Sequence, residues 1–208
     1  MTTIAVIGAT GRTGRLVVEH ALAAGHHVTA VARHPEALGP TRARLTVHSA
    51  DVLAPGSLHG VLDDQDAVIS AIGAPDRGAT TVYSAGTTEV IPALKPHGRL
   101  LVISSAGLSI PADAPAGTRL AARILHRLMR RTYADMARME ELLAASDLTW
   151  TVVRPTRLTD RPGTGRLRTS LGATARVGSQ TTRADLADYL LASIDDPRTH
   201  RTVVAISS

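Results

Sequence analysis

The sequence contains no cysteine, which excludes disulfides, thiolate metal sites and cysteine nucleophiles. Phenylalanine is also absent and aromatic residues make up only 2% of the 208 residues, so Val, Leu, Ile and Ala must build the core. Such a core suits a parallel sheet buried on both faces. No apolar run is long enough to span a membrane, and the first one, from Ile4, breaks at Gly8. We therefore expect a cytoplasmic protein with no signal peptide and no membrane partner.

Lysine is almost absent as well, because Lys95 is the only one in a chain whose formal net charge is +5. Nucleic-acid surfaces usually combine basic clusters with stacking aromatic side chains, and the aromatics are missing here, so we expect no nucleic-acid partner. The positive balance instead favours an anionic cofactor or substrate. The nine histidines show no metal-ligand spacing, and we predict no metal site.

Short apolar runs alternate with segments of helical periodicity along the whole chain. This alternation predicts the α/β class, with residues 1–208 as one Rossmann-like, doubly wound domain whose mainly parallel sheet has helices on both faces. The predicted strands cover residues 3–7, 28–32, 45–47, 66–72, 100–104, 149–153 and 202–206. The predicted helices cover residues 12–24, 55–62, 80–94, 119–146 (broken or bent) and 183–194. Residues 107–118 are expected to form a loop, and 156–181 an insertion on the substrate side.

Three glycines, at the spacing Gly-x-x-Gly-x-x-Gly, follow the first predicted strand and open the first predicted helix. They are Gly8, Gly11 and Gly14, within the sequence GATGRTG. A dinucleotide diphosphate needs backbone N–H groups that point at it and no side chains in the way, and such a turn at a helix N-terminus supplies both. An ordinary strand-to-helix turn needs one glycine rather than three. The motif therefore predicts a dinucleotide site.

Arg33 ends the second predicted strand, where NAD-binding versions of this fold carry an acidic residue that binds the ribose 2′-hydroxyl. An arginine there can pair with a 2′-phosphate, whereas a carboxylate would repel it. The position predicts NADP(H) rather than NAD(H), with Arg12 as a second contact. The alternative is an arginine that only faces solvent, in a chain rich in arginine.

Other strand ends also carry candidate site residues, each with a structural alternative. Asp51, followed by Val52, could accept a hydrogen bond from adenine or cap the segment near residue 55. Gly73 could let the backbone approach the cofactor or form a simple turn. Ser104 and Ser105 could face the nicotinamide and the substrate, although serine also caps turns.

Taken together, GATGRTG, Arg33, Asp51-Val52, Ser104-Ser105-Ala106 and TVVRP at 151–155 resemble the atypical short-chain dehydrogenase/reductase group. The resemblance spans nearly the whole chain. It is greatest to the NAD(P)H-binding proteins that include biliverdin IXβ reductase/flavin reductase and the NmrA-like regulators. It implies that the cofactor lies near Thr10, Gly11, Arg12, Thr13, Arg33, Asp51, Val52, Ile72, Gly73, Ser104, Ser105, Pro155 and Thr156. In the flavin-reductase relatives, the serine that matches Ser105 lies beside the nicotinamide.

The chain departs from the typical group at Tyr133. Most short-chain dehydrogenases use Tyr-x-x-x-Lys, in which lysine lowers the pKa of the tyrosine, but Ala137 stands where the lysine would be. Tyr133 could be a catalytic acid or a packing residue with a hydrogen-bonded tip. The flavin-reductase relatives need no such tyrosine, since they hold the nicotinamide beside a conjugated acceptor.

These observations predict a reductase that passes hydride from NADPH to a flavin, quinone-like or other conjugated acceptor. Ser105 would orient the reactants, and Arg154 and Arg157, with segments 107–131 and 156–181, would shape the acceptor side. The rivals are an NmrA-like sensor that binds NADP(H) without turnover, and a ketoreductase or epimerase that uses Tyr133. The basic segment 119–131 could guide an anionic substrate or partner, or simply be a solvated face. We expect a monomer or a homodimer.

Overall fold

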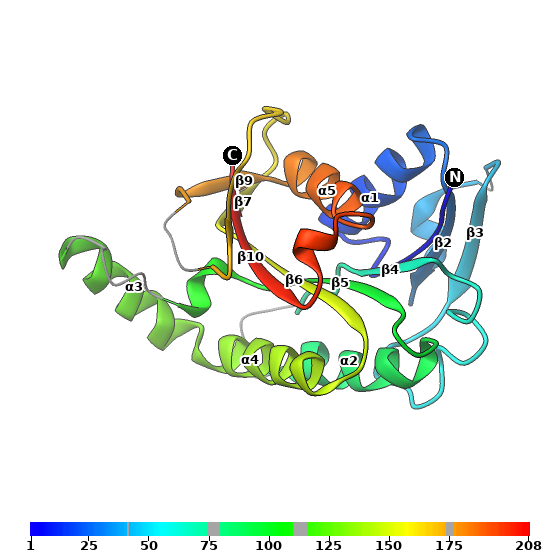
Figure 1. The fold of residues 1–208 in the computed structure, drawn as a ribbon, viewed down its shortest axis with the longest axis horizontal. Coiled ribbons are helices and arrows are strands. Elements are labelled where there is room, and N and C mark those ends of the chain that lie inside the picture. Colours follow the sequence, from blue (N-terminus) through cyan, green and yellow to red (C-terminus); the bar gives the residue numbers. More distant parts are fainter. Residues whose placement is uncertain (41, 75–79, 110–115, 174–176) are drawn as a thin grey trace.

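The computed structural model describes residues 1–40, 42–74, 80–109, 116–173 and 177–208, and its centre is an eight-stranded sheet (Figure 1). The strand order is β3-β2-β1-β4-β5-β6-β10-β8, and only the pairing of β8 with β10 is antiparallel. A second, two-stranded parallel sheet pairs β7 with β9. The strands are β1 (Thr3–Ile7), β2 (His27–Ala32), β3 (Leu45–Ser49), β4 (Ala67–Ser70), β5 (Arg99–Ile103), β6 (Thr149–Pro155), β7 (Arg157–Thr159), β8 (Arg168–Leu171), β9 (Gln180–Thr182) and β10 (Thr202–Ser207).

Helices cover both faces of the large sheet (Figure 1). Helices α1 and α5 pack together on one face, α2 and α4 pack together on the other, and α3 extends from α4 away from the sheet. The helices are α1 (Arg12–Ala23), α2 (Val82–Ala93), α3 (Ala116–Leu128), α4 (Arg130–Ala145) and α5 (Arg183–Ala192), with short 3₁₀ turns η1 (Pro35–Leu38), η2 (Ala106–Leu108) and η3 (Pro197–Thr199). The predicted Rossmann-like, doubly wound class is confirmed.

Aliphatic side chains form the core on both sides of the sheet, as the scarcity of aromatics requires. Because successive side chains of a strand point to opposite faces, Ile4 and Val6 of β1 pack with α1 and α5, while Ala5 and Ile7 pack toward α2 and α4. All four are essentially inaccessible to solvent. Two buried layers of this kind hold the carboxyl ends of the parallel strands at one rigid edge.

The predicted helix over residues 55–62 is wrong. These residues form a series of turns in which Ser57, His59 and Val61 each donate a backbone hydrogen bond to the residue three positions earlier. Gly56 and Gly60 have φ of 73° and 74°, a left-handed backbone that a right-handed helix does not accept. Apolar spacing there reflects burial of Leu58 and Leu62 under the sheet rather than a helix.

The helix predicted over 119–146 as broken or bent is broken at Met129, which separates α3 from α4. Other boundaries differ from those expected. The helical part begins earlier than expected, because residues 116–118 of the expected loop already belong to α3, and residues 110–115 lie outside the described part. The expected insertion 156–181 contains β7, β8 and part of β9.

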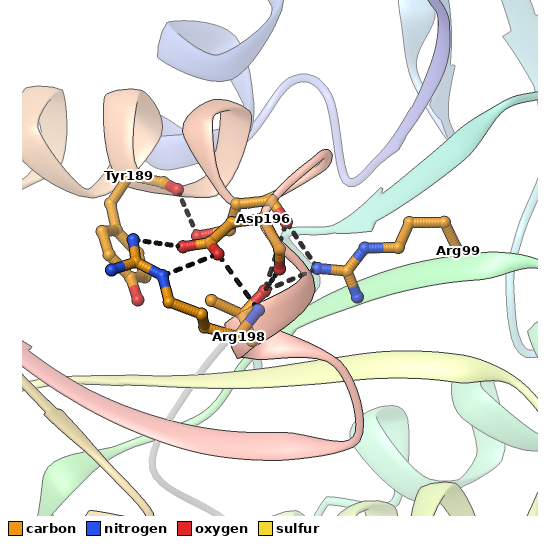
Figure 2. Close-up of polar contacts among 6 residues, drawn as sticks. Arg99, Tyr189, Asp196 and Arg198 are labelled. Carbon is orange, nitrogen blue, oxygen red and sulfur yellow. Dashed lines mark hydrogen bonds and ion pairs between the residues drawn. The ribbon is translucent and has the colours of Figure 1, made fainter.

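Arg99, the first residue of β5, joins several elements at the amino ends of the strands (Figure 2). Its guanidinium donates to the backbone carbonyls of Ile194 and Thr149, each at 3.0 Å, to that of Ser193 at 2.5 Å and to the Thr199 hydroxyl at 3.0 Å. Burial lowers the pKa of Arg99 to about 10, which leaves the side chain charged at neutral pH. This cluster lies at the edge opposite the carboxyl ends, so its role is structural.

Candidate functional site

A cleft of about 690 Å³ lies at the carboxyl ends of β1, β2, β4 and β5, where ligands bind in open α/β sheets. Most of the predicted site residues line it, from both the glycine turn and the strand ends. They are Gly8, Thr10, Gly11, Arg12, Thr13, Arg33, Asp51, Val52, Ile72, Gly73 and Ser104. The sheet topology thus brings together residues that lie far apart in the sequence, from Gly8 to Ser104.

The glycine turn has the geometry that a diphosphate requires. Gly8 has φ of 77°, and a Cβ on Gly14 would come within 2.2 Å of the Gly8 carbonyl oxygen, so helix α1 can begin this close to β1 only with glycine there. The N-cap residue Gly11 offers no side-chain hydrogen bond, and the first turn of α1 has no acidic residue. The N–H groups of that first turn are left for an anion, and the positive end of the helix dipole favours one.

Arg33 follows β2 and lines the cleft with an exposed side chain. Within the described parts of the chain, its guanidinium has no ion pair or hydrogen bond. A cationic group that lines the cleft and is not paired suits an anionic ligand group. The residues present therefore fit a dinucleotide, with backbone N–H groups at the glycine turn and a free guanidinium at the end of β2.

Asp51 stabilises the turn that follows β3. Its carboxylate accepts a hydrogen bond from the backbone N–H of Leu53 at 3.0 Å, and its backbone carbonyl accepts one from the Ser57 hydroxyl at 2.6 Å. Asp51 also lines the cleft. Its Oδ1 atom therefore stabilises the turn while the side chain lies next to the space for a ligand. A contact with adenine remains a prediction.

Ser104 and Ser105, at the end of β5, have different surroundings. Ser104 lines the cleft, is buried, and donates a hydrogen bond to Glu140 at 2.6 Å. Ser105 is outside the set of lining residues, and its hydroxyl accepts from the backbone N–H of Gly107 at 3.1 Å, so it caps η2. The structural alternative for Ser105 is thus present, and its predicted contact with the nicotinamide remains a prediction.

Arg154 on β6 is held in an ion pair with Glu140 on α4. The two side chains are only 16% and 13% exposed, with a separation of 2.5 Å between Nη2 and Oε2 and a second hydrogen bond of 3.0 Å from Nε. Because Glu140 also accepts from Ser104, one carboxylate joins β5, β6 and α4. The predicted role of Arg154 in acceptor binding requires either that this pair opens or that the pair as a whole contacts the acceptor.

Tyr133 is buried on α4 and does not line the cleft. It lines a second cavity of about 650 Å³, with Glu140, Trp150 and Arg154 among its neighbours there. Its ring packs against that of His126 with centroids 5.0 Å apart, and its hydroxyl lies so close to Gly107 that a Cβ there would come within 2.2 Å of it. These contacts suit the packing alternative for Tyr133, and its predicted catalytic role remains a prediction.

The end of β6 is fixed by hydrogen bonds rather than open to the cleft. The Thr156 N–H donates to Ile206 at 3.2 Å and to the Thr181 hydroxyl at 3.1 Å, and Pro155 is buried. Arg157 is exposed at the start of β7, and its neighbour Leu158 lines the cleft. The predicted cofactor contacts of Pro155 and Thr156 and the acceptor contact of Arg157 remain predictions.

The structure adds lining residues that the sequence alone did not indicate. Tyr83 lines the cleft, and burial raises the pKa of its phenol, whose oxygen accepts from the backbone N–H of Ala74 at 3.1 Å. Asp135 of α4 accepts from the Tyr83 N–H at 3.0 Å and thereby caps α2. Arg183, at the start of α5, also lines the cleft. No sequence motif marks these residues, because each comes from an element remote from the glycine turn.

Comparisons with known proteins agree with this geometry. Residues 8–197 match the family described as NAD(P)H-binding. An isoflavone reductase homologue of Arabidopsis thaliana is 26% identical to this chain over an alignment of 219 positions. The alignment covers 98% of this chain and 68% of that protein. The resemblance predicted from the motifs is confirmed.

Solved structures share the fold at low sequence identity. A short-chain dehydrogenase/reductase from Veillonella parvula in complex with NADP superposes with a TM-score of 0.81 at 19% identity, over 100% of this chain and 94% of that one. A candidate NADH-flavin reductase from Streptococcus pneumoniae gives 0.75 at 23% identity, over the whole of both chains. At these identities the likeness establishes the fold.

Proposed function

The chain belongs to the NAD(P)H-binding family, and on that premise we propose that it is an NADPH-dependent reductase with a flavin, quinone-like or other conjugated acceptor. Its relatives include a protein described as an oxidoreductase and one described as an isoflavone reductase homologue. The observation that carries the finer proposal is the position of Tyr133, which lines the second cavity and not the cofactor cleft. This position supports chemistry in the cleft that does not use this tyrosine.

A conjugated acceptor suits such a site because it can receive a hydride without a protein acid beside the reacting atom. The nicotinamide, when bound, supplies the hydride. Tyr83 is a phenol in the cleft, but burial raises its pKa and makes it a weaker acid. The remaining task of the protein is to hold cofactor and acceptor in contact, and the proton can come from solvent.

Preference for NADPH over NADH rests on Arg33. Its exposed guanidinium at the end of β2 lines the cleft and has no ion pair among the described residues, and a 2′-phosphate would give it a charge-assisted partner. NADH lacks that phosphate and gains nothing from the same contact.

A sensor role is the second candidate, favoured by helix α3. Its side chains Ile124, Leu125 and Leu128 are 55%, 47% and 71% exposed, whereas His126 on the opposite side contacts the body of the protein through Leu108. A helix that exposes apolar residues in this way suits contact with another molecule.

An acceptor panel distinguishes these functions. Purified protein is mixed with NADPH and, in separate reactions, a flavin, a quinone and a simple ketone, and the absorbance of NADPH is followed. We expect rapid loss with flavin or quinone and little with the ketone. NADPH binding without turnover of any acceptor would favour the sensor. Ketone turnover that is lost in Tyr133→Phe would favour the ketoreductase.

A further inference from the structure

Two arginines from different elements of the cofactor cleft meet at one carboxylate. Arg12 belongs to the glycine turn, Arg183 is the first residue of α5, and Asp160 directly follows β7. The Arg12 guanidinium lies 2.9 Å from one oxygen of Asp160, and that of Arg183 lies 2.6 Å from the other. Both arginines line the cleft.

The three side chains differ sharply in burial. That of Arg183 is only 9% exposed, whereas those of Arg12 and Asp160 are 73% and 61% exposed. A buried guanidinium needs hydrogen-bond acceptors, and within the described residues Asp160 is the one that the Arg183 guanidinium has. Two positive charges share one negative charge, so this group keeps an excess of positive charge beside the glycine turn.

A diphosphate would balance these charges better than Asp160 does. It carries two negative charges, and the same cleft presents it with the N–H groups at the start of α1. Resting on the proposed function, we propose that Arg183 is a cofactor-binding residue that joins Arg12 in binding the diphosphate of NADP(H). Asp160 is then the internal anion that holds the two arginines while the cofactor is absent.

The diphosphate can replace Asp160 as the partner of the two arginines without disturbing the segment that follows Asp160. Residues 164 and 165 are held separately by Asp185, whose carboxylate accepts from the backbone N–H groups of Thr164 and Gly165 at 2.9 Å each. On the other side, β7 is held by its pairing with β9. Release of Asp160 therefore needs a change in its own exposed side chain and not in the fold.

The test measures dissociation constants for NADPH and NADH by calorimetry in wild type, Arg183→Gln and Asp160→Asn. Asp188→Asn is the matched control. The Asp188 side chain is also 61% exposed and is also paired with a basic residue, His20. The substitution removes the same charge as Asp160→Asn, but from α5 and away from the cleft. Inorganic pyrophosphate, used as a competitor of NADPH, reports on the diphosphate subsite alone. Thermal unfolding of each variant shows whether it is folded.

Arg183→Gln should weaken NADPH and NADH by the same factor, about tenfold or more, since both contain the diphosphate. Asp160→Asn should tighten both by roughly two- to fivefold and make pyrophosphate a stronger competitor, while Asp188→Asn changes neither. If Arg183→Gln fails to fold, Asp160→Asn decides. If the wild type binds both dinucleotides but Asp160→Asn binds them no more tightly, the role given to Arg183 and Asp160 is overturned and the proposed function is not. A wild type that binds neither dinucleotide would overturn the proposed function as well.

Discussion

The proposed preference for NADPH rests on Arg33. We expect Arg33→Ala to weaken NADPH binding by about 1.5–3 kcal/mol, the value of hydrogen bonds to a charged group, and to leave NADH nearly unchanged. Titration of the variant with each dinucleotide measures both effects. Arg198→Ala is a suitable control, since it removes one exposed arginine from η3 at the opposite edge of the sheet. Equal losses for NADPH and NADH would contradict the assignment.

Arg99 is a residue of the opposite kind, since its charge serves the fold. Replacement by Met would leave the carbonyls of Ser193, Ile194 and Thr149 without this donor in a buried place. We expect Arg99→Met to lower the free energy of unfolding by roughly 3 kcal/mol, measured by urea denaturation. Cofactor affinity of the folded variant should stay at the wild-type value, because neither Arg99 nor its hydrogen-bond partners line the cleft.

At the scale of elements, the sequence predicted best where local chemistry and burial agree. The glycine turn and α1 were predictable because Gly8, Gly11 and Gly14 mark both the end of a strand and the start of a helix. The predicted helix over 55–62 is wrong because Gly56 and Gly60 adopt a left-handed backbone, which apolar spacing does not reveal. Strands β7, β8 and β9 were missed because segments of three or four residues are too short for an apolar period to appear.

The amino end of α5 is an element that should respond to pH through Asp185. Burial raises the pKa of this carboxyl, but hydrogen bonds from Ser208, from the Thr164 and Gly165 N–H groups and from Thr182 outweigh it and hold the pKa well below its usual range. Because the pKa of Asp185 is lower in the folded state, its ionised carboxylate stabilises the fold at any pH above the pKa of the unfolded state, which is about 4. This stabilisation is lost as the pH falls from there toward the pKa of the folded state.

We therefore expect Asp185→Asn to unfold more easily than wild type at pH 7, and the difference between the two to shrink as the pH is lowered from about 4. Denaturant titrations at neutral and acidic pH measure it. Asp188→Asn, on the exposed side of the same helix, serves as the control for the loss of one negative charge. A difference that stays constant down to strongly acidic pH would show that Asp185 acts through packing and not through its charge.

At the scale of the whole molecule, the cleft depends on contacts that no local pattern encodes. Arg12 and Asp160 are 148 positions apart in the sequence yet form an ion pair, and Glu140 joins Ser104 to Arg154 between three elements. The sequence predicted where single residues lie along the chain. It did not predict that Asp160 pairs with Arg12, or that Glu140 binds both Ser104 and Arg154. Within the described residues, no helix combines the length and apolar character needed to cross a bilayer.

The proposed transfer of hydride from NADPH to a conjugated acceptor in this cleft needs no help from Tyr133. Its most direct test is a single-turnover measurement, in which the oxidation of NADPH by a flavin is followed in rapidly mixed wild type and Tyr133→Phe. We expect the wild type to oxidise NADPH, and Tyr133→Phe to do so at nearly the same rate, because Tyr133 lines the second cavity. Loss of the reaction in a Tyr133→Phe variant that is folded and still binds NADPH, or no oxidation by the wild type, would overturn the proposed function.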